Sequence, residues 1–144
     1  MTNFQFRLDA ALRLRTAQER IREIKLKEVL SGISQLDVRL KLLDSQLTER
    51  SSLTATVSAT ELTHLGAWEV QTKRRIAKMT ADARQLRSEA AIHAKELTSA
   101  RQKVKVLRNL RNDAFQDWQR SLMREQEQLA AELHLAKAAS VIRS

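Results

Sequence analysis

The chain has little of what compact folds and enzyme sites need. Its 144 residues include no cysteine, no proline and no tyrosine, only two glycines, and 3% aromatics. Without cysteine there are no disulfides, thiolate nucleophiles or cysteine zinc sites, and a reducing compartment is expected. Scarce glycine and aromatics, with no proline, argue against sheets, tight turns and a deep core. This composition predicts an elongated helical protein.

The sequence also lacks a membrane or export segment. Its opening, MTNFQFRLDA, carries Arg7 and Asp9 where a signal peptide needs an apolar run. No window approaches the roughly 18 apolar residues that span a bilayer. We therefore expect a soluble, cytoplasmic protein. Charge is unbalanced, with 26 basic against 17 acidic residues and a net charge of +9, which favours anionic partners without choosing among protein, nucleic acid and lipid.

Apolar residues recur at alternating three-residue and four-residue steps in two long stretches. The first comprises Leu26, Val29, Ile33, Leu36, Leu40, Leu43 and Leu47, and the second Ile76, Met79, Ala83, Leu86, Ala90, His93, Leu97, Ala100, Val104 and Leu107. This is the coiled-coil period. It predicts an all-α fold in which two long helices form an antiparallel coiled-coil hairpin, the second helix longer than the first. We interpret His93 as a polar register position or a partly exposed spacer.

Capping residues and the loss of the heptad set the expected boundaries. Thr2 with Gln5, and Ser58 with Glu61, have capping-box spacing. The segment of residues 51–60, SSLTATVSAT, lacks the heptad and is rich in serine and threonine, whose side chains compete for backbone hydrogen bonds. We predict one elongated coiled-coil domain over 1–144, with helix one at about 3–51, a turn at about 52–58 and helix two at about 59–139.

Three finer expectations follow. An early apolar set is out of phase with the first stretch and predicts a stutter; it comprises Ala10, Leu14, Ala17, Ile21 and Ile24. Gly32 should be a tolerated weak spot in helix one. A turn centred near residue 55 would place Leu47 across from about Leu62 and Leu26 across from about Gln85, so roughly thirty residues of helix two would overhang helix one.

No motif in the chain carries chemistry. Two isolated glycines cannot form a phosphate loop or a dinucleotide fingerprint. His64, His93 and His134 lie far apart, without the spacing of helical metal ligands. We expect no catalytic residues, no metal, no cofactor and no small-molecule substrate, and hence not an enzyme.

Basic residues and aromatics instead indicate surfaces for macromolecules. The basic residues cluster at Lys73, Arg74, Arg75 and Lys78 and again at Arg101, Lys103, Lys105, Arg108 and Arg111, of which Arg101, Lys105, Arg108 and Arg111 are the candidate basic surface. They form either a solvated face or a site for an acidic protein; nucleic acid is disfavoured because no aromatics interleave with the charges. Phe115 and Trp118 fall in the expected overhang and suggest an interface, unless Trp118 packs against Phe4 or Phe6.

Two stretches resemble the flagellar export protein FliJ family. The first is Phe4-Gln5-Phe6-Arg7-Leu8 with Leu12, Leu14-Arg15 and Glu19; the second is Lys103-Val104, Leu107, Leu110, Trp118, Arg124-Glu125, Leu129 and Glu132. The resemblance implies a two-helix coiled coil of the cytoplasmic flagellar type III export apparatus, peripheral at the inner face of the membrane. Its implied partners are the export ATPase, the export gate membrane protein and export chaperones.

The resemblance also implies two binding regions. Its ATPase-binding end corresponds to Phe4, Phe6, Leu8, Leu12, Phe115, Trp118 and Leu122. Its gate-facing patch corresponds to Trp68, Thr72 and Ile76, although family members are apolar at the position of Thr72. The alternatives are an injectisome type III secretion stalk, or a basic coiled coil that binds nucleic acid or anionic membrane.

Overall fold

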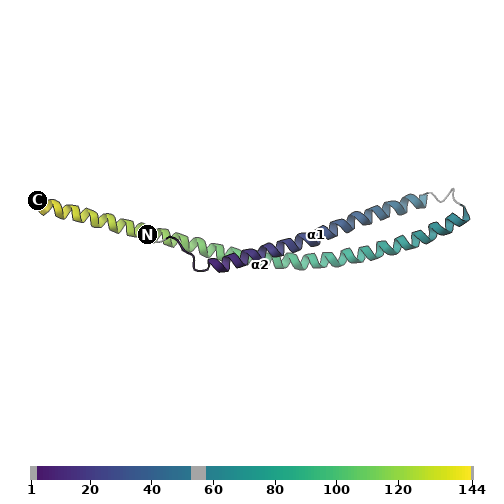
Figure 1. Ribbon diagram of the computed structural model, residues 1–144, viewed down its shortest axis with the longest axis horizontal. Coiled ribbons are helices and arrows are strands. Elements are labelled where there is room, and N and C mark those ends of the chain that lie inside the picture. The colour runs from purple at the N-terminus through teal and green to yellow at the C-terminus, as the bar shows by residue number, and fades with distance from the viewer. Residues whose placement is uncertain (1–2, 53–57, 144) are drawn as a thin grey trace. The chain divides into compact units, whose positions relative to one another are not determined.

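The structure, a computed structural model that describes residues 3–52 and 58–143, consists of two long helices packed against each other (Figure 1). Helix α1 spans Asp9–Ser52 and helix α2 spans Ala59–Arg143. The residues described contain no strand. The prediction of an all-α helical hairpin with a longer second helix is therefore confirmed.

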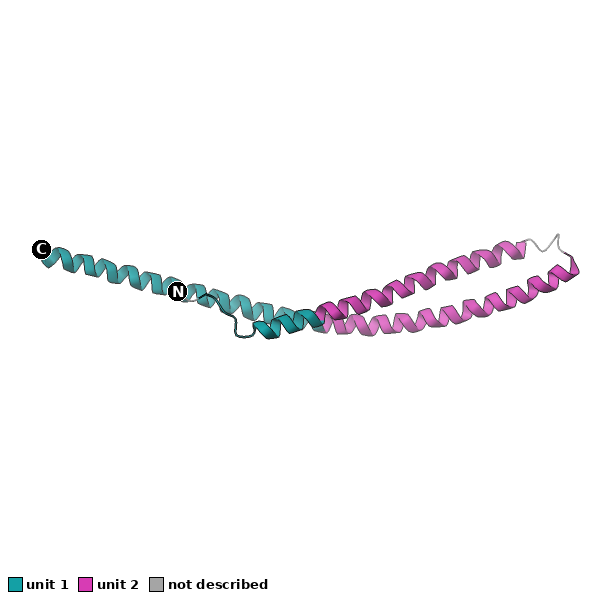
Figure 2. Cartoon of the chain, in the orientation of Figure 1, with its two compact units in different colours: residues 1–18, 100–144 teal, residues 19–99 magenta. Residues whose placement is uncertain are grey.

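The chain divides into two compact units, and both helices contribute to each (Figure 2). Unit 1 comprises residues 1–18 and 100–144, and unit 2 comprises residues 19–99. In unit 2 the core is formed by Ile33 of α1 with Ala83, Ala90 and Leu97 of α2. In unit 1 the most buried side chain is Val104, 1% exposed.

Both long heptad stretches face the partner helix, as predicted. All of their members are buried or half-buried, including His93. The smallest members, Ala83 and Ala90, are among the most buried. Short side chains at these positions let the two backbones approach closely, while the flanking leucines and isoleucine fill the space between them.

The early apolar set of α1 does not face α2, so the predicted stutter is wrong. Ala10, Leu14, Ala17, Ile21 and Ile24 are all exposed. Leu8, Leu12, Arg15, Glu19 and Arg22 are instead half-buried, and they continue the heptad of Leu26 backwards without a break. A continuous helix that packs on one partner keeps one face toward it. Arginine can occupy that face because its aliphatic stem covers apolar surface while its charged end finds a partner.

Three contacts in unit 2 fix the register of the hairpin. Arg22 forms a salt bridge with Glu96, an added Cβ at Gly32 would lie 3.7 Å from Leu86 Cδ1, and the Arg50 guanidinium lies 4.2 Å from the ring centre of Trp68. A turn centred near residue 55 would place each α1 residue opposite an α2 residue about eight positions earlier than the one it contacts. The first residues of α2, 59–64, are all exposed, which shows that α2 begins before its pairing with α1.

The helix ends differ in part from the expected ones. Helix α1 begins at Asp9, not near residue 3. The Asp9 carboxylate lies in the first turn, where a negative charge stabilises the helix, and it forms a salt bridge with Arg13 at 3.0 Å. The preceding chain makes a turn in which the Asp9 amide donates to the Phe6 carbonyl. Helix α2 begins at Ala59 as predicted, and the Glu61 amide donates to Ser58 Oγ over 3.4 Å. The predicted cap at Thr2 and most of the predicted turn lie outside the described residues.

Gly32 lies within α1 and has an ordinary helical backbone. Since its added Cβ would meet Leu86 at ordinary contact distance, we predict that Gly32→Ala raises the free energy of unfolding by about 1 kcal/mol. Thermal and urea denaturation followed by circular dichroism measure this. Gly66→Ala, where nothing lies within 4 Å, is the matched control and should stabilise similarly. A loss of stability confined to Gly32→Ala would contradict the packing described.

His93 is a polar residue within the heptad whose Nδ1 is buried without a hydrogen bond to any described residue. This atom lies 3.6 Å from Glu96 Oε2, which is too far for a hydrogen bond. Since a buried unpaired nitrogen costs about 1–3 kcal/mol, we predict that His93→Leu stabilises the hairpin by about 1 kcal/mol. The same denaturation measurement applies. His64→Leu, at an exposed position of α2, should have no such effect, and a destabilised His93→Leu variant would show that His93 contributes favourably.

Candidate protein-binding surfaces

An aromatic cluster in unit 1 joins the N-terminal segment to α2. The Phe4 ring lies 5.1 Å from that of Phe115, edge to face, and 5.8 Å from that of Trp118. Phe115 and Trp118 stack at 5.7 Å, one helical turn apart. These spacings are typical of favourable aromatic pairs, worth about 0.5–1.5 kcal/mol each beyond area burial. The cluster holds the segment before α1 against α2.

The packing of Phe4 corrects one expectation about the end of the coil. Phe115 and Trp118 are not left uncovered by this chain, because Phe4 contacts both. The alternative, that Trp118 packs against Phe4, describes the structure. Phe115 is nonetheless 40% exposed. The cluster therefore still presents aromatic surface that a partner can cover.

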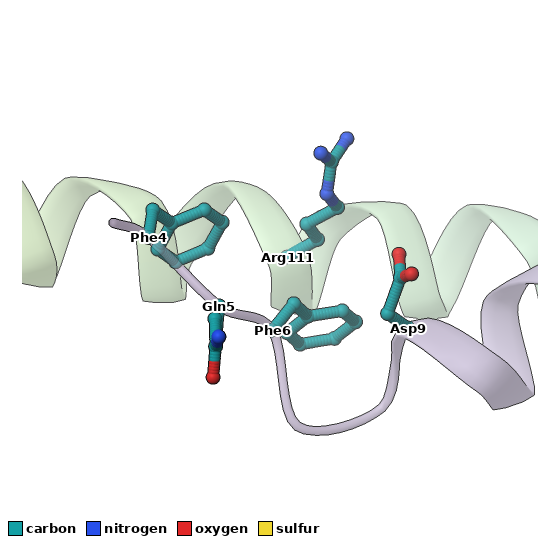
Figure 3. A pocket seen from close by; sticks show the side chains of 5 residues that line it. All are labelled: Phe4, Gln5, Phe6, Asp9 and Arg111. Carbon is teal, nitrogen blue, oxygen red and sulfur yellow. The ribbon is translucent and has the colours of Figure 1, made fainter. Parts of the chain in front are cut away.

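Beside the cluster lies a shallow pocket of about 330 Å³, lined by Phe4, Gln5, Phe6, Asp9 and Arg111 (Figure 3). Figure 3 shows Gln5 pointing away from α2, with the Arg111 guanidinium on the opposite side. Sequence reasoning found the phenylalanines and Arg111 but missed Gln5 and Asp9, because nothing predicted a turn before α1. Because Asp9 and Arg111 are among the lining residues, the pocket can make polar contacts with a protein side chain.

The remaining predicted residues of this end also belong to unit 1. Leu8, Leu12 and Leu122 are half-buried. Beyond them, α2 continues without cover: from residue 123 to residue 143 every side chain is exposed. Several are large and apolar, namely Met123, Leu129, Leu133, Leu135, Val141 and Ile142. At 3.6 residues per turn these side chains are distributed around the helix, so they do not form one apolar face.

Unit 1 is also strongly basic where its two helices pair. Residues 3–18 and 100–112 contain eight cations and a single carboxylate, Asp9. The cations are Arg7, Arg13, Arg15, Arg101, Lys103, Lys105, Arg108 and Arg111, which we call the basic cluster. The predicted basic surface at Arg101, Lys105, Arg108 and Arg111 is exposed. Arg13 forms an ion pair with Asp9, and the excess of cations over carboxylates in these two ranges gives the cluster a positive potential.

The predicted gate-facing residues lie in unit 2 and differ in accessibility. Thr72 is 4% exposed and lies within the hairpin core. Ile76 is half-buried, and Trp68 is half-buried beneath the guanidinium of Arg50. Only Trp68 and part of Ile76 can therefore contact another protein. The stacking of Arg50 on Trp68 was not predicted, since it depends on the register of the hairpin.

Metal-binding groups and membrane-spanning helices are both absent from the described residues. No three His, Asp or Glu side chains gather in a way that could hold a metal ion. In the same residues, neither helix is apolar enough over a sufficient length to cross a bilayer. No family model, curated protein or solved structure matches the chain.

The aromatic cluster gives a direct test of the end of the coil. In a Trp68→Phe background only Trp118 emits, and we predict that Phe4→Ala shifts its emission to longer wavelength because Phe4 covers its ring. The same change should cost about 1–2 kcal/mol of stability, since two aromatic contacts are lost. Ile92→Ala, an exposed position of α2 in unit 2, serves as the control. An unchanged Trp118 spectrum in Phe4→Ala would contradict the cluster.

Proposed function

We propose that this protein is a non-enzymatic stalk or coupling component of the flagellar type III protein export apparatus. It acts in the cytoplasm, peripheral to the inner face of the membrane at the flagellar base. In this role it binds the export ATPase ring and the export gate and assists the handling of chaperones. The protein supplies a helical framework and binding surfaces and carries out no reaction of its own.

One observation carries the proposal. The two stretches that resemble the family lie about a hundred residues apart in sequence, yet both contribute to unit 1, where Phe4 of the first contacts Trp118 of the second. Coiled-coil sequences resemble one another mainly through their heptads. Phe4 and Trp118 lie outside the two long heptad stretches, and their contact brings the two resembling stretches together at one site. It supports a single binding region formed by both stretches.

The charge of this end supports an acidic partner. The basic cluster adjoins the aromatic cluster, since Arg111 shares a pocket with Phe4 and Phe6. A positive surface beside exposed aromatics fits a partner that lines its binding surface with carboxylates and apolar residues. We assign the ATPase to this end. Trp68 and Ile76 are the surface residues left for the gate, with Thr72 supporting them from the core.

The proposal is tested by the hydrolysis rate of the purified flagellar export ATPase from the same organism, with and without this protein. We predict stimulation or ring assembly that Phe115→Ala and Trp118→Ala reduce about tenfold or more, a loss typical of central aromatic contacts. Ile92→Ala, exposed and in unit 2, should behave as the parent protein. Circular dichroism confirms that each variant is folded.

The same assay separates the alternatives. Stimulation by aromatic contacts should persist in part at about 150 mM salt, whereas binding to nucleic acid or anionic lipid through charge alone should collapse steeply. Absence of any effect on the flagellar ATPase by the folded protein would refute the flagellar proposal. Stimulation of an injectisome ATPase instead would favour the stalk of that system.

A further inference from the structure

Helix α1 carries a second heptad on the face turned away from α2. Within unit 2 this outer stripe runs through Ile21, Ile24, Glu28, Ser31, Gln35, Val38 and Leu42 at alternating three-residue and four-residue steps. Every one of these residues is exposed. Its apolar members are largely exposed to solvent, Val38 by 64% and Leu42 by 58%. One helix thus has the spacing for two helical partners, of which the hairpin supplies only one.

The middle of the stripe has small and polar side chains and is hollowed. A shallow depression of about 430 Å³ is lined there by Ile24, Lys27, Glu28, Ser31, Gly32 and Gln35. Ser31 and Gly32 are the smallest of these lining residues, so a larger side chain of another helix has room at this point. The stripe extends over about 30 Å of helix, enough for a partner helix of about twenty residues.

The charges beside the stripe have one sign. In a coiled coil the positions flanking the apolar seam select the partner by charge. On one flank of the stripe these positions hold Arg20, Lys27 and Lys41, and on the other Lys25 and Arg39. Lys27 pairs with Glu23, whereas the other four form no salt bridge within the described part of the chain. No acidic residue occupies a flanking position.

We propose that the outer stripe of α1 binds an acidic amphipathic helix of a partner protein, which packs as a third helix along the hairpin. Its apolar residues cover Ile21, Ile24, Val38 and Leu42. Its carboxylates face the basic flanks. This surface is independent of the aromatic end assigned to the ATPase, so the proposal holds whether or not the proposed function does.

Charge and composition decide against the other occupants. A second copy of this chain would place the same arginines and lysines against one another. A membrane surface requires a broad apolar face with interfacial aromatics, but this stripe is interrupted by Glu28, Ser31 and Gln35. Phosphates of a nucleic acid would pair with the cations and leave the isoleucines, valine and leucine uncovered, without aromatics for base stacking.

The test uses two synthetic peptides of about four heptads, both with leucine at the seam positions, one with glutamate and one with lysine on the flanks. Their binding to the whole chain is followed by fluorescence anisotropy of a labelled peptide. We predict that the glutamate peptide binds with a Kd in the micromolar range and the lysine peptide does not bind. The double variant Val38→Ser, Leu42→Ser should weaken binding about tenfold. Ile92→Ser, equally exposed on α2, should not.

A charge exchange makes the test specific. In the double variant Lys25→Glu, Arg39→Glu the preference should reverse toward the lysine peptide, while Lys95→Glu on α2 should leave it unchanged. Equal binding of both peptides, or insensitivity to the changes at Val38 and Leu42, would overturn the proposal. So would binding to vesicles of anionic phospholipid or to duplex DNA when neither peptide binds.

Discussion

The contact between the inner face of α1 and the small residues of α2 is the constraint on which the rest depends. Ala83 and Ala90 are almost fully buried, which brings the two backbones close, and Ile33 and Leu97 complete the core of unit 2. Burial of an apolar face against the partner helix contributes most of the stability of the paired parts, because isolated helices gain little from propensity alone. Every surface described depends on this pairing, since it decides which residues of each helix remain outside.

The period of the sequence predicted the fold because it reflects the same geometry that packs the helices. Both long heptads were recognised in full, and the start of α2 at Ala59 followed from its cap. The prediction for the early part of α1 is wrong because apolar character there does not coincide with burial. Arg15, Glu19 and Arg22 occupy the inner face there, and Leu14, Ile21 and Ile24 the outer one. Continuity of the helix outweighed the local composition.

The positions of the candidate site residues depend on the pairing of the two helices and on the non-helical segment before α1 more than on the heptad period. Phe4 reaches Phe115 and Trp118 only because α1 begins at Asp9 and the preceding residues turn back onto α2. No heptad argument can locate such a turn. Thr72 lies in the core although the family position is surface-facing, because it stands four residues before Ile76 and continues the inner heptad of α2. Register shifts of a few residues are nearly invisible in a sequence with repeated leucines.

The most direct test of the account is the distance between spin labels at Asp37→Cys and Arg87→Cys, which form an exposed salt bridge across unit 2. The chain has no cysteine of its own, so both labels report only on these positions. The account predicts a single short distance that persists when the labelled protein is diluted with unlabelled protein, because the helices pair within one chain. A distance that disappears on dilution, or a broad distribution at long range, would contradict the hairpin and its register.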